Sequence, residues 1–312
     1  MAERIKPSMS WEEKVDITCR KLEGFKAYKP SFKDWMLNLP CKVHFFDHKM
    51  YFRCWQIFNS LRDDNDHFIL MLAEPGTGKS TLLLQMGATI SPEKFRLKLV
   101  SYDFEGFVAG LVTKEKYDFF DLDEGGLILN SADRSSKGTM LDKLSVIMRQ
   151  FNLCVGICMT DFLLLRRHFR NTRINTMIHL TKRGKYRIIT GKGIDAVRQQ
   201  IRNKNGNMSA IRMPNGTFYD GYFSKAIPEI NDITETSYLA GKHKNAEKFV
   251  KEIEEMASDV KQVKEGKYMS VKEAAKSLSV STETIKRKLK DGTLKGKKLG
   301  SKWCVTKASV EA

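Results

Sequence analysis

The stretch His67-Phe-Ile-Leu-Met-Leu-Ala-Glu-Pro-Gly-Thr-Gly-Lys-Ser-Thr-Leu-Leu-Leu-Gln-Met86 decides the fold of this 312-residue chain. It starts with an apolar run that ends at Leu72 and continues with a loop that contains Gly76 and Gly78. A second apolar run follows directly from Lys79. This order predicts a buried strand, a phosphate-binding loop and a helix.

The loop carries the residue types that hold the phosphates of ATP. Glycines let the backbone turn its N–H groups inward, and the start of the helix adds a partial positive charge. Lys79 is expected to reach the β- and γ-phosphates, and the Ser80 hydroxyl to bind Mg²⁺. Ala73 stands where the usual pattern has its first glycine. The residues predicted to surround ATP are Glu74, Pro75, Gly76, Thr77, Gly78, Lys79, Ser80 and Thr81.

Further apolar runs alternate with helical patterns after the loop. The runs Leu97–Tyr102, Tyr117–Leu122, Leu153–Met159 and Ile174–Leu180 are predicted strands. Strands that alternate with helices indicate an α/β fold, in which a parallel sheet has helices on its faces.

An acidic pair predicts the second half of the nucleotide site. In ATPases with a phosphate loop, an acid at the end of a neighbouring apolar strand holds Mg²⁺, and a following carboxylate polarises the attacking water. Asp123 fits the metal role and Glu124 the catalytic role. Asp121 lies on the same face of the strand as Asp123, so it could share or take over the metal role.

Two further features are candidates for catalysis. Thr160 follows the strand Leu153–Met159, where a polar side chain can sense the γ-phosphate or cap a helix. Arg170 and Arg173 flank a turn-like pair before the next strand, and either could complete the site of a neighbouring subunit. A basic surface that faces DNA or solvent explains these arginines equally well.

The net charge of +17 is concentrated in two regions. Residues 161–213 contain thirteen Lys or Arg and two Asp, and residues 267–312 contain twelve Lys or Arg and four acids. Two basic regions on a nearly neutral body predict a polyanionic partner, with double-stranded DNA as the first candidate. A basic surface that only aids solubility is the alternative. The sequence lacks a signal peptide and a long apolar run, which predicts a cytoplasmic protein.

The last part of the chain has the pattern of a small helical domain. Ser270 and Glu273 form a capping box that starts one helix, and Thr282–Lys290 is a predicted second helix. Two short strand-like runs that meet at Gly300-Ser301 predict a hairpin. These elements together predict a helix-turn-helix followed by a wing, with a protein-binding helical module as the alternative.

The chain therefore divides into four predicted parts. Residues 1–58 form an aromatic-rich N-terminal extension without recognisable chemistry, and residues 59–233 form the nucleotide-binding domain. Residues 234–266 are a helical linker, and residues 267–312 are the winged helix-turn-helix domain.

The order of motifs over residues 60–230 resembles the RecA-like ATPases of the HerA-FtsK type and the related Zot-like proteins. The motifs are the loop Ala73–Ser80, the strand that ends at Asp123-Glu124, the strand that ends at Thr160, and the arginines before a further strand. The family often has Gln where Thr160 stands. The resemblance implies a homo-oligomeric ring, such as a hexamer, that drives DNA through a central pore.

Residues 268–312 resemble the excisionase/MerR-type DNA-binding domain. This resemblance implies that the second helix faces the major groove, while further lysines meet phosphates. The implied groove residues are Thr282, Glu283, Lys286 and Arg287, and the implied phosphate contacts are Lys290, Lys297, Lys298 and Lys302. Trp303 is expected to pack under the wing.

These patterns favour an ATPase that moves or remodels DNA and is recruited by its helix-turn-helix. A nucleotide-switched DNA-binding regulator, such as a replication, partition or transcription factor, fits the same motifs without translocation. A small-molecule kinase also uses a phosphate loop, but it does not explain the two basic regions.

Overall fold

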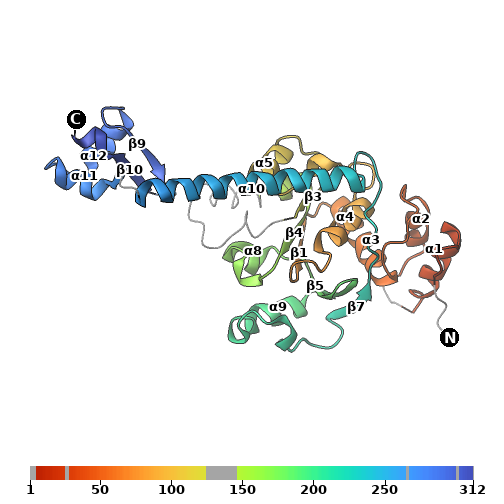
Figure 1. Ribbon diagram of the computed structural model, residues 1–312. Helices are drawn as coiled ribbons and strands as arrows, with labels where there is room; N and C mark the ends of the chain where they lie inside the picture. Colours follow the sequence, from red (N-terminus) through yellow and green to blue (C-terminus); the bar gives the residue numbers. More distant parts are fainter. Residues whose placement is uncertain (1–4, 25–27, 124–145, 265–266, 300–301, 312) are drawn as a thin grey trace. The chain divides into compact units, whose positions relative to one another are not determined.

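The computed structural model describes residues 5–24, 28–123, 146–264, 267–299 and 302–311 (Figure 1). The chain folds into two compact units, Met1–Ala240 and Gly241–Ala312. Each unit has its own hydrophobic core.

A seven-stranded sheet forms the centre of the first unit, with the order β2-β3-β4-β1-β5-β6-β7. The strands from β2 to β5 run parallel, whereas β6 and β7 are antiparallel additions at one edge. Every residue of β1 and β4 is buried, as expected for central strands covered on both faces. The strands are β1 (His67–Leu72), β2 (Val100–Ser101), β3 (Phe119–Leu122), β4 (Cys154–Met159), β5 (Thr176–Lys182), β6 (Lys185–Ile189) and β7 (Phe218–Tyr222).

The predicted α/β class with a mainly parallel sheet is therefore confirmed. The predicted strand Leu97–Tyr102 is shorter in the structure, because the 3-10 turn Leu97–Leu99 takes up its first half. The antiparallel β6 and β7 were not predicted. In both strands, buried and exposed residues alternate only weakly, so the sequence has no clear strand pattern there. The strands form because β6 pairs with β5 and β7 pairs with β6 in the folded protein.

Helices and short turns connect the strands. The helices of this part are α4 (Lys79–Ile90), α5 (Phe104–Val112), α8 (Arg167–Thr172) and α9 (Lys192–Gln200), and residues 146–151 are also helical. Short 3-10 turns span Phe162–Leu164, Arg202–Lys204 and Met208–Ala210. Helix α4 packs on β1, β3 and β4. It approaches β4 closely because Gly156 leaves room for Leu83, whose Cδ1 atom would lie 2.3 Å from an added Cβ.

Three N-terminal helices pack into the same core as the sheet. They are α1 (Trp11–Arg20), α2 (Ser31–Leu37) and α3 (His48–Arg62), so α3 continues past residue 58. Asp47 caps α3 and also accepts hydrogen bonds from the Tyr186 hydroxyl (2.7 Å) and the Tyr222 amide (2.8 Å). This one carboxylate therefore connects α3 to the strands β6 and β7.

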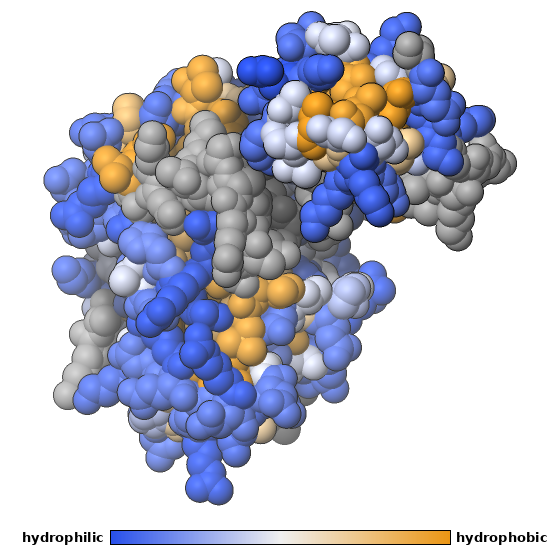
Figure 2. Space-filling view, turned by 90° about the vertical axis from the view of Figure 1, so that its left-hand side faces the viewer, coloured by the Kyte–Doolittle hydropathy of each residue, from blue (hydrophilic) through white to orange (hydrophobic). Residues whose placement is uncertain are grey.

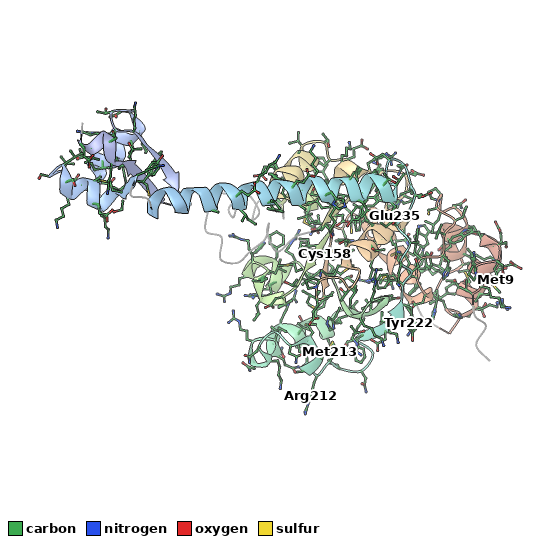
Figure 3. The ribbon with its side chains drawn as sticks, viewed as in Figure 1. Met9, Cys158, Arg212, Met213, Tyr222 and Glu235 are labelled. Carbon is green, nitrogen blue, oxygen red and sulfur yellow. The ribbon has the colours of Figure 1, made fainter. Side chains whose placement is uncertain are left out.

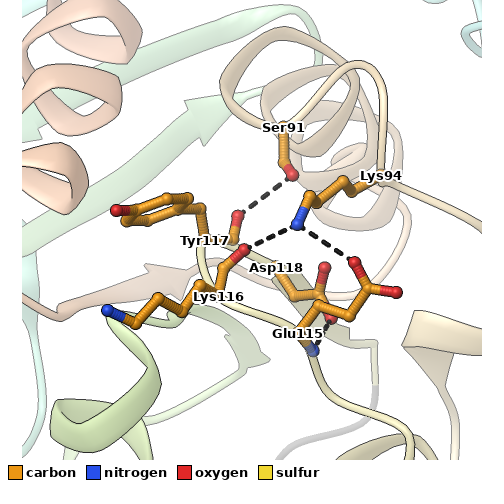
Figure 4. A network of polar contacts seen from close by, with 6 residues as sticks. All are labelled: Ser91, Lys94, Glu115, Lys116, Tyr117 and Asp118. Atoms are coloured by element: carbon orange, nitrogen blue, oxygen red, sulfur yellow. Dashed lines mark hydrogen bonds and ion pairs between the residues drawn. The ribbon is translucent and has the colours of Figure 1, made fainter.

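A polar network fixes the segment that leads into β3 (Figure 4). Lys94 donates hydrogen bonds of 3.0 Å to the Glu115 carboxylate and to the Lys116 carbonyl. Ser91, at the end of α4, donates one of 3.1 Å to the Tyr117 carbonyl. The network thus connects the end of the helix that follows the glycine loop with the strand that carries Asp121.

The second unit is built around a helix pair and a three-stranded antiparallel sheet of order β8-β10-β9. Its elements are β8 (Tyr268–Ser270), α11 (Val271–Ser277), α12 (Thr282–Lys290), β9 (Gly296–Leu299), β10 (Lys302–Thr306) and α13 (Lys307–Glu311). The predicted capping box of Ser270 and Glu273 is present. Helix α10 (Glu235–Lys264) begins in the first unit and continues into the second.

The core of the second unit agrees with the predicted helix-turn-helix and wing. Ile285 and Leu289 are buried with Ala274 and Ala275, and Trp303 packs against this cluster. The strand β8, which pairs with β10, was not predicted because three residues are too few to show a period.

The visible face in Figure 2 is mainly hydrophilic, with smaller hydrophobic areas between charged residues. Within the described residues, no helix is both long and apolar enough to cross a bilayer.

Candidate nucleotide site and nucleic-acid interface

The glycine loop lies between the end of β1 and the start of α4. Gly76 has φ = 78° and Gly78 has φ = 98°, values in the left-handed region that other residues rarely adopt. Gly78 is the N-terminal cap of α4, so the first N–H groups of this 12-residue helix face the loop. An anion placed there would meet these N–H groups and the positive end of the helix dipole.

The Lys79 side chain folds back over this loop. Its Nζ atom donates hydrogen bonds to the carbonyl oxygens of Ala73 (2.8 Å) and Glu74 (3.0 Å). The Thr77 hydroxyl also donates to the Glu74 carbonyl (2.8 Å). These bonds hold the loop in an arched form with the ammonium group beside it.

The sheet brings two acidic residues to the same edge as the loop. Asp121 lies in β3 and Asp123 directly follows it, and their exposed fractions are 0% and 3%. Strand β4 separates β3 from β1, so the acidic strand is not the direct neighbour that the sequence pattern indicated. Because β1, β4 and β3 are parallel, their carboxyl ends still meet at one edge. The predicted catalytic Glu124 lies outside the described residues.

A tyrosine from α10 joins the two halves of this site. The Tyr238 hydroxyl donates a hydrogen bond of 2.8 Å to Oδ2 of Asp123 and is also hydrogen-bonded to the Ser80 side chain. Burial and the nearby Asp123 carboxylate raise the pKa of Tyr238 well above its ordinary value, so its hydroxyl keeps the proton that it donates. The Ser80 hydroxyl and the Asp123 carboxylate are therefore connected through a single atom, the hydroxyl oxygen of Tyr238.

The residues at this position suit Mg²⁺ and a nucleotide. Mg²⁺ prefers oxygen ligands and commonly binds one or two carboxylates together with waters and phosphate oxygens. Ser80 and Asp123 supply a hydroxyl and a carboxylate, and Asp121 lies close enough to raise the pKa of Tyr238 as well. Ser80 and Asp123 would hold the metal, while Lys79 and the loop amides would hold the phosphates.

Thr160 lies at the end of β4, between the strand of the glycine loop and the strand of Asp123. It is exposed, whereas the next residue, Asp161, caps the turn Phe162–Leu164 by accepting a hydrogen bond of 2.8 Å from the Leu163 amide. The capping role that the sequence left open thus belongs to Asp161.

Arg170 is largely buried within the chain, with 8% of it exposed. It donates a hydrogen bond of 3.1 Å to the Leu163 carbonyl and lies over the Phe162 ring. It also lines a cavity of about 310 Å³ together with Arg167, Arg198 and Arg202. Burial and then the charges of Arg202 and Arg167 lower the pKa of Arg170, while the nearby Asp161 raises it.

Arg173 forms an ion pair with Asp66, directly before β1. This end of β1 lies about 20 Å from the glycine loop, since six residues of a strand span roughly this length. Arg173 therefore lies far from the nucleotide site of its own chain.

The predicted DNA-contacting residues of α12 share an accessible surface. Glu283, Lys286, Arg287 and Lys290 are exposed, and Thr282 is half-buried. Lys286 forms an ion pair of 2.6 Å with Glu283 one turn earlier. The backbone of Lys297, Lys298 and Lys302 lies in the strands of the wing, and their side chains are outside the described residues.

Sequence reasoning missed three residues in or behind the candidate nucleotide site. Tyr238 comes from the helix assigned as a linker, and nothing in its local pattern marks it. Phe223 lies against Gly78, where an added Cβ would be 3.1 Å from the ring. The buried Gln85 of α4 donates hydrogen bonds to the carbonyls of Ser224 (3.1 Å) and Ala226 (2.6 Å) and so holds the segment of Phe223 in place.

Comparisons with known proteins identify the C-terminal part of the second unit. A family model described as a helix-turn-helix domain matches residues 268–312. No curated protein matches the chain. Among solved structures, the crystal structure of the N-terminal domain of zonular occludens toxin from Neisseria meningitidis is similar at 14% identity and a TM-score of 0.33. That match covers 45% of this chain and 91% of the other.

Proposed function

We propose that this protein is an ATPase that binds ATP with Mg²⁺ at the glycine loop and couples hydrolysis to work on double-stranded DNA. The observation that carries the proposal is the convergence of Ser80 and Asp123 on one Tyr238 hydroxyl. These two residues come from separate motifs and are 43 positions apart in the chain. Their proximity beside a left-handed Gly78 supports a site for a magnesium nucleotide.

Each residue has a distinct task in the proposed reaction. The α4 amides and Lys79 bind and orient the phosphates, and Ser80 and Asp123 hold the metal. Bound Mg²⁺ would neutralise charge on the phosphate oxygens. Glu124, two positions after Leu122 of β3, would orient the attacking water and accept its proton.

The helix-turn-helix domain supports DNA as the partner. Helix α12 exposes Lys286, Arg287 and Lys290 on a small unit whose fold matches the helix-turn-helix family. Such helices enter the major groove, and their basic residues contact bases and phosphates. We propose that this unit recruits the ATPase to duplex DNA and that the chain assembles into a ring.

ATP hydrolysis measured with and without duplex DNA tests the proposal, together with the mass of the protein in ATP. We expect DNA to stimulate hydrolysis and ATP to increase the mass. Lys79→Ala should lower the rate by at least about 100-fold, as the loss of a charge that stabilises the transition state does. Lys29→Ala, at an exposed lysine outside the site, is the control. Hydrolysis that is indifferent to DNA and insensitive to Lys79→Ala would rule out the proposal.

The continuity of α10 favours a second function. This helix starts at the candidate nucleotide site in the first unit, and its later turns belong to the second unit, as expected for a regulator in which ATP switches DNA binding without translocation. Displacement of a triplex strand along duplex DNA separates the two functions. Displacement that requires ATP identifies a motor, whereas site-specific DNA binding that survives Glu124→Gln without displacement identifies a switch.

A further inference from the structure

A cavity that contains four arginines lies outside the glycine loop. Its volume of about 310 Å³ is at the lower end of the usual range for small-molecule sites. Its walls come from the turn Phe162–Leu164, from α8, and from α9 with the turn that follows it. Among the described residues, no acidic side chain lines the cavity, and the arginines are Arg167, Arg170, Arg198 and Arg202.

Arg170 is held in the wall of this cavity without a carboxylate partner in the part of the chain that the structure describes. It is 8% exposed, and its guanidinium donates to the Leu163 carbonyl and lies over the Phe162 ring. Burial lowers the pKa of Arg170, and so do the charges of Arg202 and Arg167, each more strongly than Asp161 raises it. A buried charge is costly unless an opposite charge compensates it. Arg170 therefore favours an anion in the cavity.

The other three arginines keep hydrogen-bond donors available. Arg198 donates from Nε to the Arg170 carbonyl (2.8 Å) and from Nη1 to the Asp195 carboxylate (2.8 Å). Arg167 and Arg202 are exposed, and neither forms a hydrogen bond or an ion pair with any other described residue. A guanidinium has five N–H donors, so each of these side chains can still bind a ligand.

The end of α9 is held in place by the segment that contains Arg212. Gln200, the last residue of α9, donates a hydrogen bond of 2.8 Å to the Arg212 carbonyl and accepts one of 3.1 Å from the Arg212 amide. Figure 3 labels Arg212, whose exposed side chain does not line the cavity. These bonds fix the backbone beside Arg198 and Arg202 before any ligand binds, which lowers the entropic cost of binding.

We propose that this cavity is a second anion site, which binds phosphate groups through its four arginines. Asp161 and Asp195 lie nearby, but the four guanidinium groups exceed these two carboxylates by two charges. A terminal phosphate group carries about −1.5 to −2 charges at pH 7 and balances this excess. Guanidinium groups also form paired hydrogen bonds to phosphate oxygens. The site is separate from the glycine loop and does not depend on ATP hydrolysis there.

Two kinds of molecule present such phosphate groups. A free polyphosphate, such as pyrophosphate or a nucleotide, suits a cavity of small-molecule size. A nucleic-acid strand is too large to enter, but it can place a backbone phosphate against the exposed Arg167 and Arg202. Both sources share the same chemistry, so the experiment has an arm for each.

Titration calorimetry with inorganic pyrophosphate tests the site at physiological salt, with a chelator in place of Mg²⁺. The full-length protein carries Lys79→Ala, because the glycine loop also attracts phosphates. We expect a Kd of about 0.1 mM or tighter. Adding Arg167→Gln together with Arg202→Gln should weaken binding at least about tenfold, since hydrogen bonds between charged groups are lost.

The matched control removes the same charge outside the cavity. Arg183→Gln together with Arg212→Gln changes two exposed arginines that do not line it. This pair should alter the affinity by less than about twofold, because screening at physiological salt weakens charges that do not contact the ligand. A short DNA duplex added to the pyrophosphate complex identifies the source. Displacement of pyrophosphate indicates a backbone phosphate, whereas simultaneous binding indicates a free polyphosphate.

Backbone hydrogen exchange locates the bound pyrophosphate. In the Lys79→Ala protein, exchange at residues 162–171 and 198–203 should slow at least about threefold when pyrophosphate is added. A Kd weaker than about 1 mM, or equal losses of affinity in the cavity and control variants, would overturn the proposal. If the cavity variant does not fold, unchanged exchange at these residues overturns it as well. ATP hydrolysis is not measured here, so a protein without ATPase activity contradicts only the proposed function.

Discussion

Arg173 forms an ion pair with Asp66 at the end of the sheet opposite the glycine loop. Asp66 directly precedes β1, and Arg173 precedes β5, the parallel neighbour of β1. The ion pair therefore links the amino ends of β1 and β5, which are adjacent strands of the sheet. This position gives Arg173 a structural task within its own chain, whereas a role in the site of a second copy stays a prediction.

If Arg173 is structural, Arg173→Gln should lower the free energy of unfolding by about 2 kcal/mol, because it leaves a largely buried carboxylate without its partner. A double-mutant cycle with Asp66→Asn should give a coupling energy of about 1–3 kcal/mol in urea unfolding. ATP hydrolysis lost at unchanged unfolding free energy would instead assign Arg173 to catalysis.

Gly78→Ala should weaken the glycine loop. The φ of 98° costs a non-glycine residue about 1–3 kcal/mol, and the added methyl would lie 3.1 Å from the Phe223 ring. We expect a lower thermal midpoint together with weaker nucleotide binding. Gly24→Ala is the control, since no atom lies within 4 Å of its Cβ position. Equal thermal midpoints for the two variants would contradict the strain argument.

Lys290→Ala should reduce the salt dependence of DNA binding. If Lys290 contacts one phosphate, the slope of log affinity against log salt concentration should become shallower by about 0.9. Lys276→Ala removes the same charge from α11 and should leave the slope nearly unchanged. Fluorescence anisotropy with a duplex at several salt concentrations measures both slopes. Equal changes in the two variants would mean that α12 is not the DNA-facing helix.

Acid should destabilise the first unit through His67. Burial and the charge of Arg53 lower the pKa of His67 well below its ordinary value, so the folded protein holds this ring neutral. The unfolded chain binds a proton below about pH 6.5, and each pH unit below that value removes up to about 1.4 kcal/mol of stability until the folded pKa is reached.

Urea unfolding between pH 7 and pH 5 measures this slope. His67→Gln should flatten it by about one proton, whereas substitution of the exposed His243 by Gln should not change it. A slope that is the same in wild type and His67→Gln would show that other groups cause the acid sensitivity.

Local patterns were enough to predict most of the framework. The run His67–Leu72 could be recognised as a buried strand because all its side chains are in the core, and Gly76, Gly78 and Lys79 mark the loop through their fixed spacing. The capping box of Ser270 and Glu273 likewise depends on residues three positions apart. These features are encoded within one turn of helix or one strand, where sequence spacing and spatial distance agree.

The tertiary structure decided which distant residues meet. In the sheet, β4 lies between β1 and β3, and the antiparallel strands β6 and β7 follow β5 at one edge. Asp66 became the partner of Arg173. None of these pairings has a fixed separation along the chain, so no local pattern could reveal them.

The sequence by itself determined that this protein has a glycine loop, an acidic strand end and a C-terminal helix-turn-helix. Only the tertiary structure placed Tyr238 between Ser80 and Asp123. The physical reason is that a hydroxyl's hydrogen bonds depend on positions in space. Tyr238 reaches its partners only after the sheet has assembled and the start of α10 has packed against it.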